Sequence, residues 1–184
     1  MPTRATTIPA FTIIIDTREQ TPYTFAGIRD RHAPRSRPGQ PAPFVKVRTH
    51  RAKLDVGDYG VILDNGWNAQ VIVERKTLAD LYQTLGKERD RFEREVELAN
   101  ELGIQLHLVV ESDFAGLMRV PSHVRQVTAR TITGTLASWS IRFPWLHVWT
   151  PGPREAAEKW TYRLLEFAAE NCAKATREPG RNGV

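Results

Sequence analysis

Residues 57–76 read GDYGVILDNGWNAQVIVERK and form the most informative stretch of the chain. Two short apolar runs, 59–63 and 69–73, flank the pair Asn65-Gly66. An Asn-Gly pair between apolar runs is a strong signal for a β-hairpin. The stretch therefore predicts two antiparallel strands with charged residues at their open end.

The charged residues of this hairpin share one face only for certain connection lengths. Alternate residues of a strand point to the same side, so Glu74 and Lys76 point together and Arg75 points away. A two-residue turn directs Asp58 away from Glu74, whereas a three-residue loop at 65–67 sets these two carboxylates opposite each other. We therefore predict an odd-length turn or a bulge, because a one-residue slip reverses every side chain.

With that connection, two carboxylates and one ammonium group meet at the end of the hairpin. Asp58 and Glu74 offer hard oxygen ligands to Mg²⁺ or Mn²⁺. Such an ion polarises a phosphoryl oxygen and activates a water, and Lys76 can stabilise the charge that develops. The trio suits phosphodiester hydrolysis, although on spacing alone a hairpin turn beside a solvated charge run explains the same residues.

The segments around the hairpin indicate an α/β fold, in which helices flank a central mixed β-sheet. A chain of 184 residues is long enough for one domain with a full core. We expect a single domain over 11–172, with flexible tails at 1–10 and 173–184. Further strands are expected at 11–15, 44–49, 105–110 and 146–149, and helices at 77–85, 87–102, 122–140 and 154–172.

The positive charge of the chain is concentrated in one segment. Residues 26–53 contain eight basic residues and one acidic residue, a local charge of +7, whereas the whole chain carries +5. Such a concentration is typical of a surface that binds a polyanion, and a solvated flexible loop is the alternative. Residues 21–43 are rich in Pro, Arg and Gly without periodicity, so we expect a long, mobile basic loop there.

Composition excludes several other classes of protein. The chain has one cysteine, Cys172, which rules out an internal disulfide framework and a cysteine-based zinc site. No run approaches the roughly 20 apolar residues that span a bilayer, and the start of the chain lacks the pattern of a signal peptide. We therefore expect no membrane partner and an intracellular, cytoplasmic location, or a nuclear one in a eukaryote.

The order of the motifs resembles the nuclease domain of the XPF endonuclease family, which includes the archaeal Hef nuclease. The segments IDTREQ (15–20), GDYGVILDNGWNAQVIVERKTLADL (57–81), LGKERDRFERE (85–95) and TITGTLASWSIRFPWLHVWTPGPREAAEKW (131–160) match in order. The resemblance covers residues 11–171 and implies a restriction-endonuclease-like nuclease core. It also implies a Mg²⁺-dependent endonuclease that cleaves branched or flapped DNA near junctions between single and double strands.

The resemblance assigns roles to individual residues. It implies metal binding by Asp58 and Glu74, with Asp16 and Glu19 near the metal, and catalytic roles for Lys76 and Arg75. Because Arg75 points away from Lys76, its role can also be structural, with Asp80 as its partner or as an acid of the helix cap. We expect DNA contacts from Arg18, Arg35, Arg37, Arg48, Arg51, Lys87, Arg89 and Arg91.

Alternatives remain open at this stage. A non-catalytic DNA-binding partner, or a nuclease of the same fold that acts on four-way junctions or plain duplex, would share many of these features. Thr77 stands where the family usually has Ser, and the chain leaves no room for a second DNA-binding domain, so we expect a stand-alone nuclease domain. Pairing of two copies through the late helices and core packing are both open for the aromatic residues Trp139, Phe143, Trp145, Trp149, Trp160 and Phe167.

Overall fold

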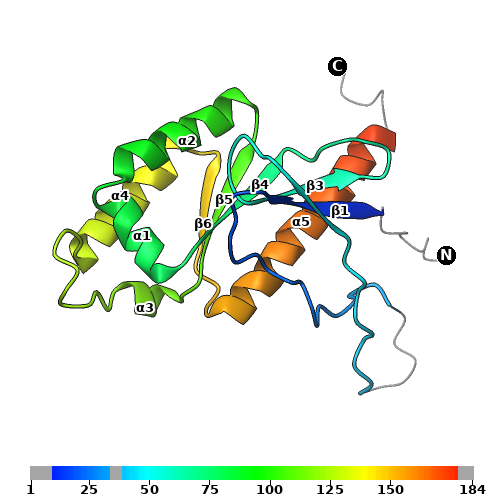
Figure 1. Cartoon of the computed structure of the whole chain (residues 1–184), viewed down its shortest axis with the longest axis horizontal. Coiled ribbons are helices and arrows are strands. Elements are labelled where there is room, and N and C mark those ends of the chain that lie inside the picture. The colour runs from blue at the N-terminus through cyan, green and yellow to red at the C-terminus, as the bar shows by residue number, and fades with distance from the viewer. Residues whose placement is uncertain (1–9, 34–38, 178–184) are drawn as a thin grey trace.

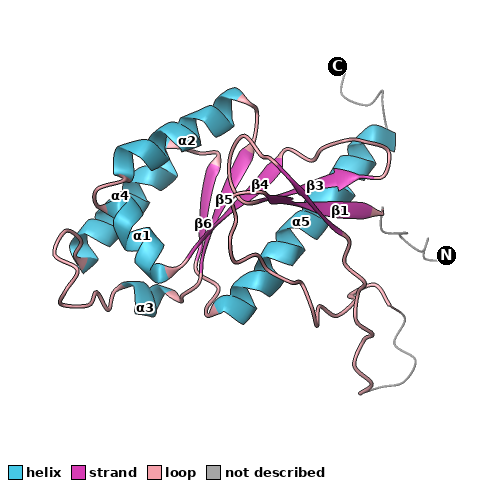
Figure 2. Ribbon diagram, in the orientation of Figure 1, coloured by secondary structure: helices cyan, strands magenta, loops and turns pink. Residues whose placement is uncertain are grey.

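A computed structural model describes residues 10–33 and 39–177 and shows a six-stranded sheet with helices on both faces (Figures 1 and 2). The strands are β1 (Phe11–Asp16), β2 (Thr49–Ala52), β3 (Tyr59–Leu63), β4 (Val71–Lys76), β5 (Gln105–Val110) and β6 (Leu146–Trp149). The helices are α1 (Leu78–Leu85), α2 (Arg89–Glu101), α3 (Phe114–Leu117), α4 (Ala129–Arg142) and α5 (Arg154–Arg177). The expected α/β fold is confirmed.

The sheet is mixed, with the strand order β2-β1-β3-β4-β5-β6. Strand β3 runs antiparallel to β1 and β4, whereas β2 pairs in parallel with β1, and β5 in parallel with β4 and β6. The carboxyl ends of β1, β4 and β5 therefore lie at one edge of the sheet, together with the amino end of β3. The charged residues of the hairpin lie at this edge.

Each inner strand contributes side chains to both faces of the sheet, because successive residues point to opposite sides. On β5, Val109 packs into a core with Leu165 of α5, whereas Leu106 and Leu108 pack into a second core with Trp139 of α4. Helices α1 and α2 also cover this second face, and α5 lies across the first (Figure 1). Neighbouring residues of one strand therefore meet different helices.

The loop of the β3–β4 hairpin has three residues. Leu63 N–H donates to the Trp67 carbonyl (2.9 Å), which leaves residues 64–66 as the loop. This loop begins one residue earlier than the expected 65–67. Its odd length agrees with the prediction.

A bulge follows the loop on the returning strand. Ile62 pairs with Asn68 in an isolated bridge, and Tyr59 pairs with Val73. Three steps along β3 therefore correspond to five steps along the returning segment, which carries two extra residues. An odd-length turn and a bulge are both present, so the expectation is confirmed. Together they leave Asp58 and Glu74 on the same face of the sheet, as the site requires.

Two expected elements differ from the structure. No strand forms over 44–49, because Val45 N–H bonds to the Ile28 carbonyl (2.8 Å) of the preceding segment, and the sheet strand begins only at Thr49. The helix expected from residue 122 begins at Ala129, where the Thr128 side chain accepts from Thr131 N–H and caps it. In the first case a backbone bond to a distant segment replaces the expected strand, and in the second a side-chain cap fixes where the helix begins.

The described residues of the basic segment, 21–33 and 39–43, form no helix or named strand, and some of them pack against the rest of the domain. Tyr23, Phe25 and Ile28 are buried in the core beside α5. Arg31 also forms ion pairs with two buried glutamates of α5. Arg35 and Arg37, two of the expected DNA contacts, lie outside the described residues.

Across residues 10–33 and 39–177, no helix combines the length and the apolar character that crossing a membrane requires.

Candidate active site

Asp58 and Glu74 meet at the open end of the β3–β4 hairpin. Tyr59 pairs with Val73, and Asp58 and Glu74 are the next residue on each strand, close enough for the charge of Glu74 to act on Asp58. Asp58 N–H donates to the Val73 carbonyl (2.8 Å), and the backbone N–H of Arg75 donates to Asp58 Oδ2 (2.8 Å). The Asp58 side chain is thereby fixed against the end of β4.

Gly57 is required for this approach. Its φ is +66°, a backbone angle that residues other than glycine rarely adopt. A Cβ here would lie 2.4 Å from Ile72 Cγ2. The backbone thus passes close above β4 immediately before Asp58. A glycine at this place lets the carboxylate reach the strand end.

Lys76 forms a buried ion pair with Glu74. Its Nζ donates to Glu74 Oε1 (2.6 Å), and the two side chains are 10% and 12% exposed. Both residues point to the face covered by α2, where Nζ lies 5.3 Å from the centre of the Phe92 ring. The expected grouping of Asp58, Glu74 and Lys76 is therefore present.

Helix α2 adds a carboxylate, Glu95, that was not among the expected site residues. Glu95 Oε1 accepts from Gly57 N–H (3.2 Å), and its charge acts on both Glu74 and Lys76. The signal for it was its position three residues after Phe92, at the margin of the buried stripe of α2. Glu95 links α2 to the turn that carries Asp58.

The pKa values show that negative charge is undercompensated in this cluster. Burial, followed by the charge of Glu74, raises the pKa of Asp58 to about 8. Burial also raises the pKa of Glu74, and the ion pair with Lys76 only partly opposes this. Burial alone would lower the pKa of Lys76, but Glu74 outweighs it and the pKa is raised. A cation of higher charge would stabilise both carboxylates.

The donor atoms fit a small divalent cation that takes its remaining ligands from water and phosphate. Among the hydrogen bonds of the described residues, none reaches Asp58 Oδ1 or Glu74 Oε2. The described residues contain no group of three or more His, Cys, Asp or Glu side chains placed to hold a metal ion. Two carboxylates are nevertheless sufficient for Mg²⁺, which keeps several waters and binds substrate phosphates.

Asp16 and Glu19 were expected to contribute to the metal site, but the structure engages them elsewhere. Asp16 accepts from Arg18 N–H and Nε (both 2.7 Å) and from Leu54 N–H (2.6 Å). Glu19 Oε1 accepts from Thr21 N–H (2.7 Å). Both acids therefore stabilise the turn that follows β1, and the charge of Glu19 also acts on Asp58, so their place near the metal stays a prediction.

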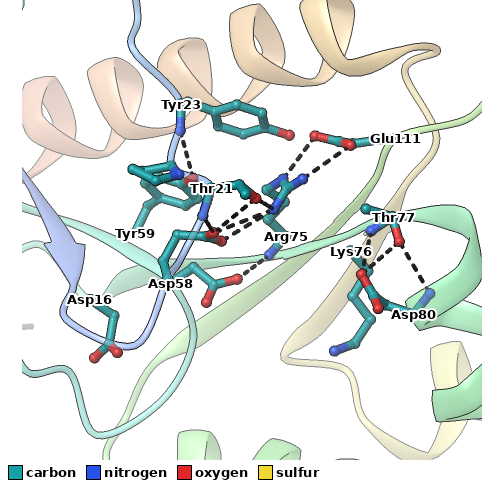
Figure 3. A network of polar contacts seen from close by, with 12 residues as sticks. Asp16, Thr21, Tyr23, Asp58, Tyr59, Arg75, Lys76, Thr77, Asp80 and Glu111 are labelled. Atoms are coloured by element: carbon teal, nitrogen blue, oxygen red, sulfur yellow. Dashed lines mark hydrogen bonds and ion pairs between the residues drawn. The ribbon is translucent and has the colours of Figure 1, made fainter.

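Arg75 lies on the other side of the strand, toward α5, where its guanidinium is almost fully buried (Figure 3). It binds Glu111 through Nε (2.8 Å) and Nη2 (3.2 Å), and its Nη1 contacts Thr21 Oγ1 (3.0 Å) and Glu19 (3.4 Å). Figure 3 shows Lys76 pointing away from this network. These contacts are structural, and the catalytic role of Arg75 that the resemblance implies stays a prediction.

Two members of the Arg75 network were missed by the sequence analysis. Glu111 follows β5, and its N–H donates to the Lys76 carbonyl (2.9 Å) of the neighbouring parallel strand. Arg154, at the start of α5, donates to Glu111 Oε1 (2.9 Å). The signal for Glu111 was available, because the carboxyl ends of parallel strands meet at one edge.

Asp80 is an acid of the helix cap and not the partner of Arg75. The side chain of Thr77 accepts from Asp80 N–H, and the Asp80 carboxylate accepts from Thr77 N–H, which forms a capping box at the start of α1. Thr77 differs from the family's serine only by a methyl group. The hydroxyl that both residues share forms the cap. The cap fixes where the chain leaves the site.

Three of the expected DNA contacts have partners within the protein. Arg18 pairs with Asp16, although 61% of its side chain is exposed. Arg48 pairs with Asp64 near the hairpin loop, at the opposite end of β1 from the site. Arg51 donates to three carbonyl groups of the turn after β1. Of the three, Arg18 alone borders the candidate site with an exposed guanidinium.

The three residues around the start of α2 that were expected to contact DNA differ in how free their side chains are to do so. Arg89 pairs with Glu93 one turn later, and Arg91 pairs with Glu88 but is 66% exposed. Lys87 is exposed and has no ion pair within the described residues. Lys87 is therefore the member of this group most free to contact a phosphate.

The aromatic residues of the late helices divide between two environments. Trp139 is fully buried and Phe143 nearly so, which places both in the core beside α4. Trp160 and Phe167 of α5 are 39% and 48% exposed. The other two tryptophans of the set are partly buried against the cores. Core packing thus accounts for part of the set, and α5 keeps two exposed aromatic rings.

Comparison with known proteins gives one family and a consistent fold. The family model of the ERCC4 domain matches residues 15–164. The chain is similar in fold to XPF from Aeropyrum pernix, with a TM-score of 0.56 and 18% identity over 90% of this chain and 67% of that one. A structure of XPF from Aeropyrum pernix in complex with DNA gives 0.53 and 17% over 95% and 68%. No curated protein sequence matches the chain.

Proposed function

The chain belongs to the ERCC4 domain family, that of the XPF-type nucleases, and from this premise we propose that it is a Mg²⁺-dependent endonuclease that cleaves branched or flapped DNA. The observation that carries the proposal is the buried grouping of Asp58, Glu74 and Lys76 at the hairpin end. The retained acids argue against a non-catalytic DNA-binding partner. We place the activity inside the cell, where DNA is found.

In the proposed reaction, Asp58 and Glu74 would hold the cation, and Asp58 Oδ1 and Glu74 Oε2 are the oxygens that accept no hydrogen bond from the described residues. Bound Mg²⁺ or Mn²⁺ supplies polarisation of the phosphoryl oxygen and activation of a water. Lys76 brings a positive charge beside the phosphate and stabilises the negative charge of the transition state. The ion pair with Glu74 orients that ammonium group before the substrate arrives.

Cleavage assays with labelled DNA test the proposal. Flap, splayed-arm, four-way and plain duplex DNA are incubated with Mg²⁺ and with wild type, Asp58→Asn or Asp55→Asn. Asp58→Asn removes the charge but keeps the shape, and we expect its cleavage rate to fall at least about a hundredfold. The exposed Asp55, three residues earlier, is the matched control and should cleave normally.

The outcome also separates the proposed substrate from the alternatives. Faster cleavage of flap and splayed-arm DNA supports the branched substrate, whereas preference for four-way junctions or plain duplex redirects it. No cleavage of any substrate by the wild type, or equal cleavage by Asp58→Asn, contradicts the nuclease proposal.

We also propose that two copies pair through α5, which presents the exposed rings of Trp160 and Phe167. Exposed aromatic residues of this size are enriched at protein interfaces. Sedimentation equilibrium of wild type and Trp160→Asp tests this pairing. A wild type that remains monomeric at tens of micromolar would contradict it.

A further inference from the structure

A groove separates α1 from the segment that leads to α4. It has a volume of about 650 Å³, which lies in the range of pockets that hold small ligands. Its floor is apolar and includes Leu78 and Tyr82 from α1, and Val124 and Val127 from the facing segment. Nothing in the proposed reaction uses this groove.

The rim of the groove is basic. Lys87, Arg125 and His123 line it, and its lining contains no acidic residue. Lys87 and Arg125 are exposed and, within the described residues, form no ion pair, whereas Arg89 and Arg91 nearby are paired with glutamates. The groove therefore offers two free cations above an apolar floor, and its charge is complementary to a polyanion.

The groove begins next to the candidate active site. Leu78, one end of its floor, is two residues after Lys76, and α1 continues along it to Leu85. A helix of this length spans roughly 12 Å, which corresponds to about four nucleotides of a stacked strand. A strand that leaves the cleaved bond along α1 would reach the groove within a few nucleotides.

We propose that this groove binds the single-stranded arm of the DNA substrate, a proposal that rests on the nuclease function above. Lys87 and Arg125 contact its phosphates, and the apolar floor contacts the faces of its unpaired bases. Proteins that bind single strands combine these two features. A duplex hides its base faces in the stack and gains only the phosphate contacts, so the groove favours the arm over the paired region.

The test compares two DNAs that share one duplex, of which one is blunt and the other carries a single-stranded tail. Binding is followed by fluorescence anisotropy without divalent cations, so that no cleavage is required. The variant Lys87→Ala/Arg125→Ala should bind the tailed DNA about tenfold more weakly and the blunt DNA normally. Its salt slope on the tailed DNA should fall by about 1.4, since each phosphate contact to a single strand contributes about 0.7.

A matched control removes the same charge from the opposite face of the sheet. Lys159→Ala/Lys174→Ala changes two exposed lysines of α5 and should leave the affinity for the tailed DNA at the wild-type value. Equal losses in the two double variants, or equal losses on tailed and blunt DNA, contradict the proposed groove and indicate a general charge effect.

A third variant fills the groove without changing its charge. Ala79 is exposed and lines the groove, so Ala79→Trp should keep the folded structure while it blocks the floor. We expect weaker binding of tailed DNA with an unchanged salt slope and an unfolding temperature within about 2 °C of wild type. Unaltered binding of tailed DNA by both groove variants overturns the proposal.

The two proposals fail separately. Tail binding is measured without metal, so a wild type that binds the tail but never cleaves DNA contradicts the nuclease proposal and leaves the groove intact. If the wild type cleaves branched DNA but the groove variants bind tailed DNA normally, the groove proposal is contradicted and the nuclease proposal stands.

Discussion

Folding strongly alters the protonation of the Asp58 carboxylate. Its pKa is raised to about 8 in the folded protein by burial and by Glu74, from an ordinary value of 3.8. Between these two values the folded chain holds a proton that the unfolded chain has released. Stability without metal therefore decreases as the pH rises through this interval and levels off above about pH 8.

We predict that the unfolding free energy of the metal-free protein decreases from pH 6.5 to 9, by at most about 1.4 kcal/mol per unit for one proton. Asp58→Asn should flatten this decrease, and Mg²⁺ should restore more stability at pH 9 than at pH 6.5, because the carboxylates must be ionised to bind it. Urea unfolding at several pH values measures both effects. Parallel curves for wild type and Asp58→Asn contradict the assignment.

His107 limits the pH range in which this measurement is clean. Burial, followed by the charge of His147, lowers its pKa to about 4, and its Nδ1 accepts from Trp149 Nε1–H (2.9 Å). Because the folded pKa lies below the ordinary 6.5, stability is lost as the pH falls through this range. The slope from the histidine disappears about one pH unit above the ordinary value, where the unfolded chain has also lost this proton.

Glu95 provides a second prediction at the scale of single residues. Glu95→Gln keeps the shape of the side chain that accepts from Gly57 N–H but removes a negative charge near Glu74. We expect the affinity for Mn²⁺, measured by electron paramagnetic resonance without DNA, to fall about tenfold. Glu97→Gln, an exposed residue of the same helix, is the control. Equal affinities in all three proteins would remove Glu95 from the site.

At the scale of elements, strand and helix prediction succeeded where the side-chain pattern and the backbone partners agree. The strands at 59–63, 105–110 and 146–149 have the expected bounds, and the parity of the β3–β4 connection followed from the need to bring Asp58 to Glu74. The stretch 44–49 has the alternation of a strand, but its backbone bonds to a neighbouring loop. No sequence pattern specifies that partner.

The candidate site was predictable to a similar extent. The trio of Asp58, Glu74 and Lys76 follows from residue spacing and family resemblance, because all three lie on one hairpin. Glu95 and Glu111 come from other elements, and only the packing of α2 and β5 against the hairpin brings them close. Contacts between segments distant in sequence are therefore the part that spacing alone does not determine.

The capping box at the start of α1 gives a prediction for one element. Thr77→Ala removes the side-chain acceptor for Asp80 N–H and should lower the unfolding free energy by about 1 kcal/mol. Thr77→Ser retains the hydroxyl and should stay within about 0.5 kcal/mol of wild type. Chemical denaturation measures both, and an equal loss in the two variants would show that the methyl group, not the cap, is responsible.

At the scale of the whole molecule, the Arg75 network joins four separate segments: the turn after β1, the end of β4, the end of β5 and the start of α5. Arg75→Ala leaves the buried Glu19 without its cation and leaves Glu111 with Arg154 as its remaining partner. Loss of one member of a buried pair is strongly destabilising, so we expect about 3–5 kcal/mol less stability. Unfolding by urea measures the loss, and Arg94→Ala, an exposed arginine of α2, is the control.

The double variant Arg75→Ala/Glu111→Ala distinguishes a network from independent contacts. Removing both partners should cost less than the sum of the two single losses, because neither member of the Arg75–Glu111 pair is left behind without the other. Strict additivity of the two losses would contradict the buried network.

Successive side chains of β4 point to opposite faces of the sheet, and this arrangement has a genetic consequence. Glu74 and Lys76 face the chemistry beside α2, whereas Arg75 faces the joint beside α5. Substitutions at three consecutive codons should therefore fall into two phenotypic classes. Substitutions that keep the side-chain shape at 74, such as Glu74→Gln, should give folded but inactive protein, and those at 75 should give temperature-sensitive alleles that low temperature partly rescues.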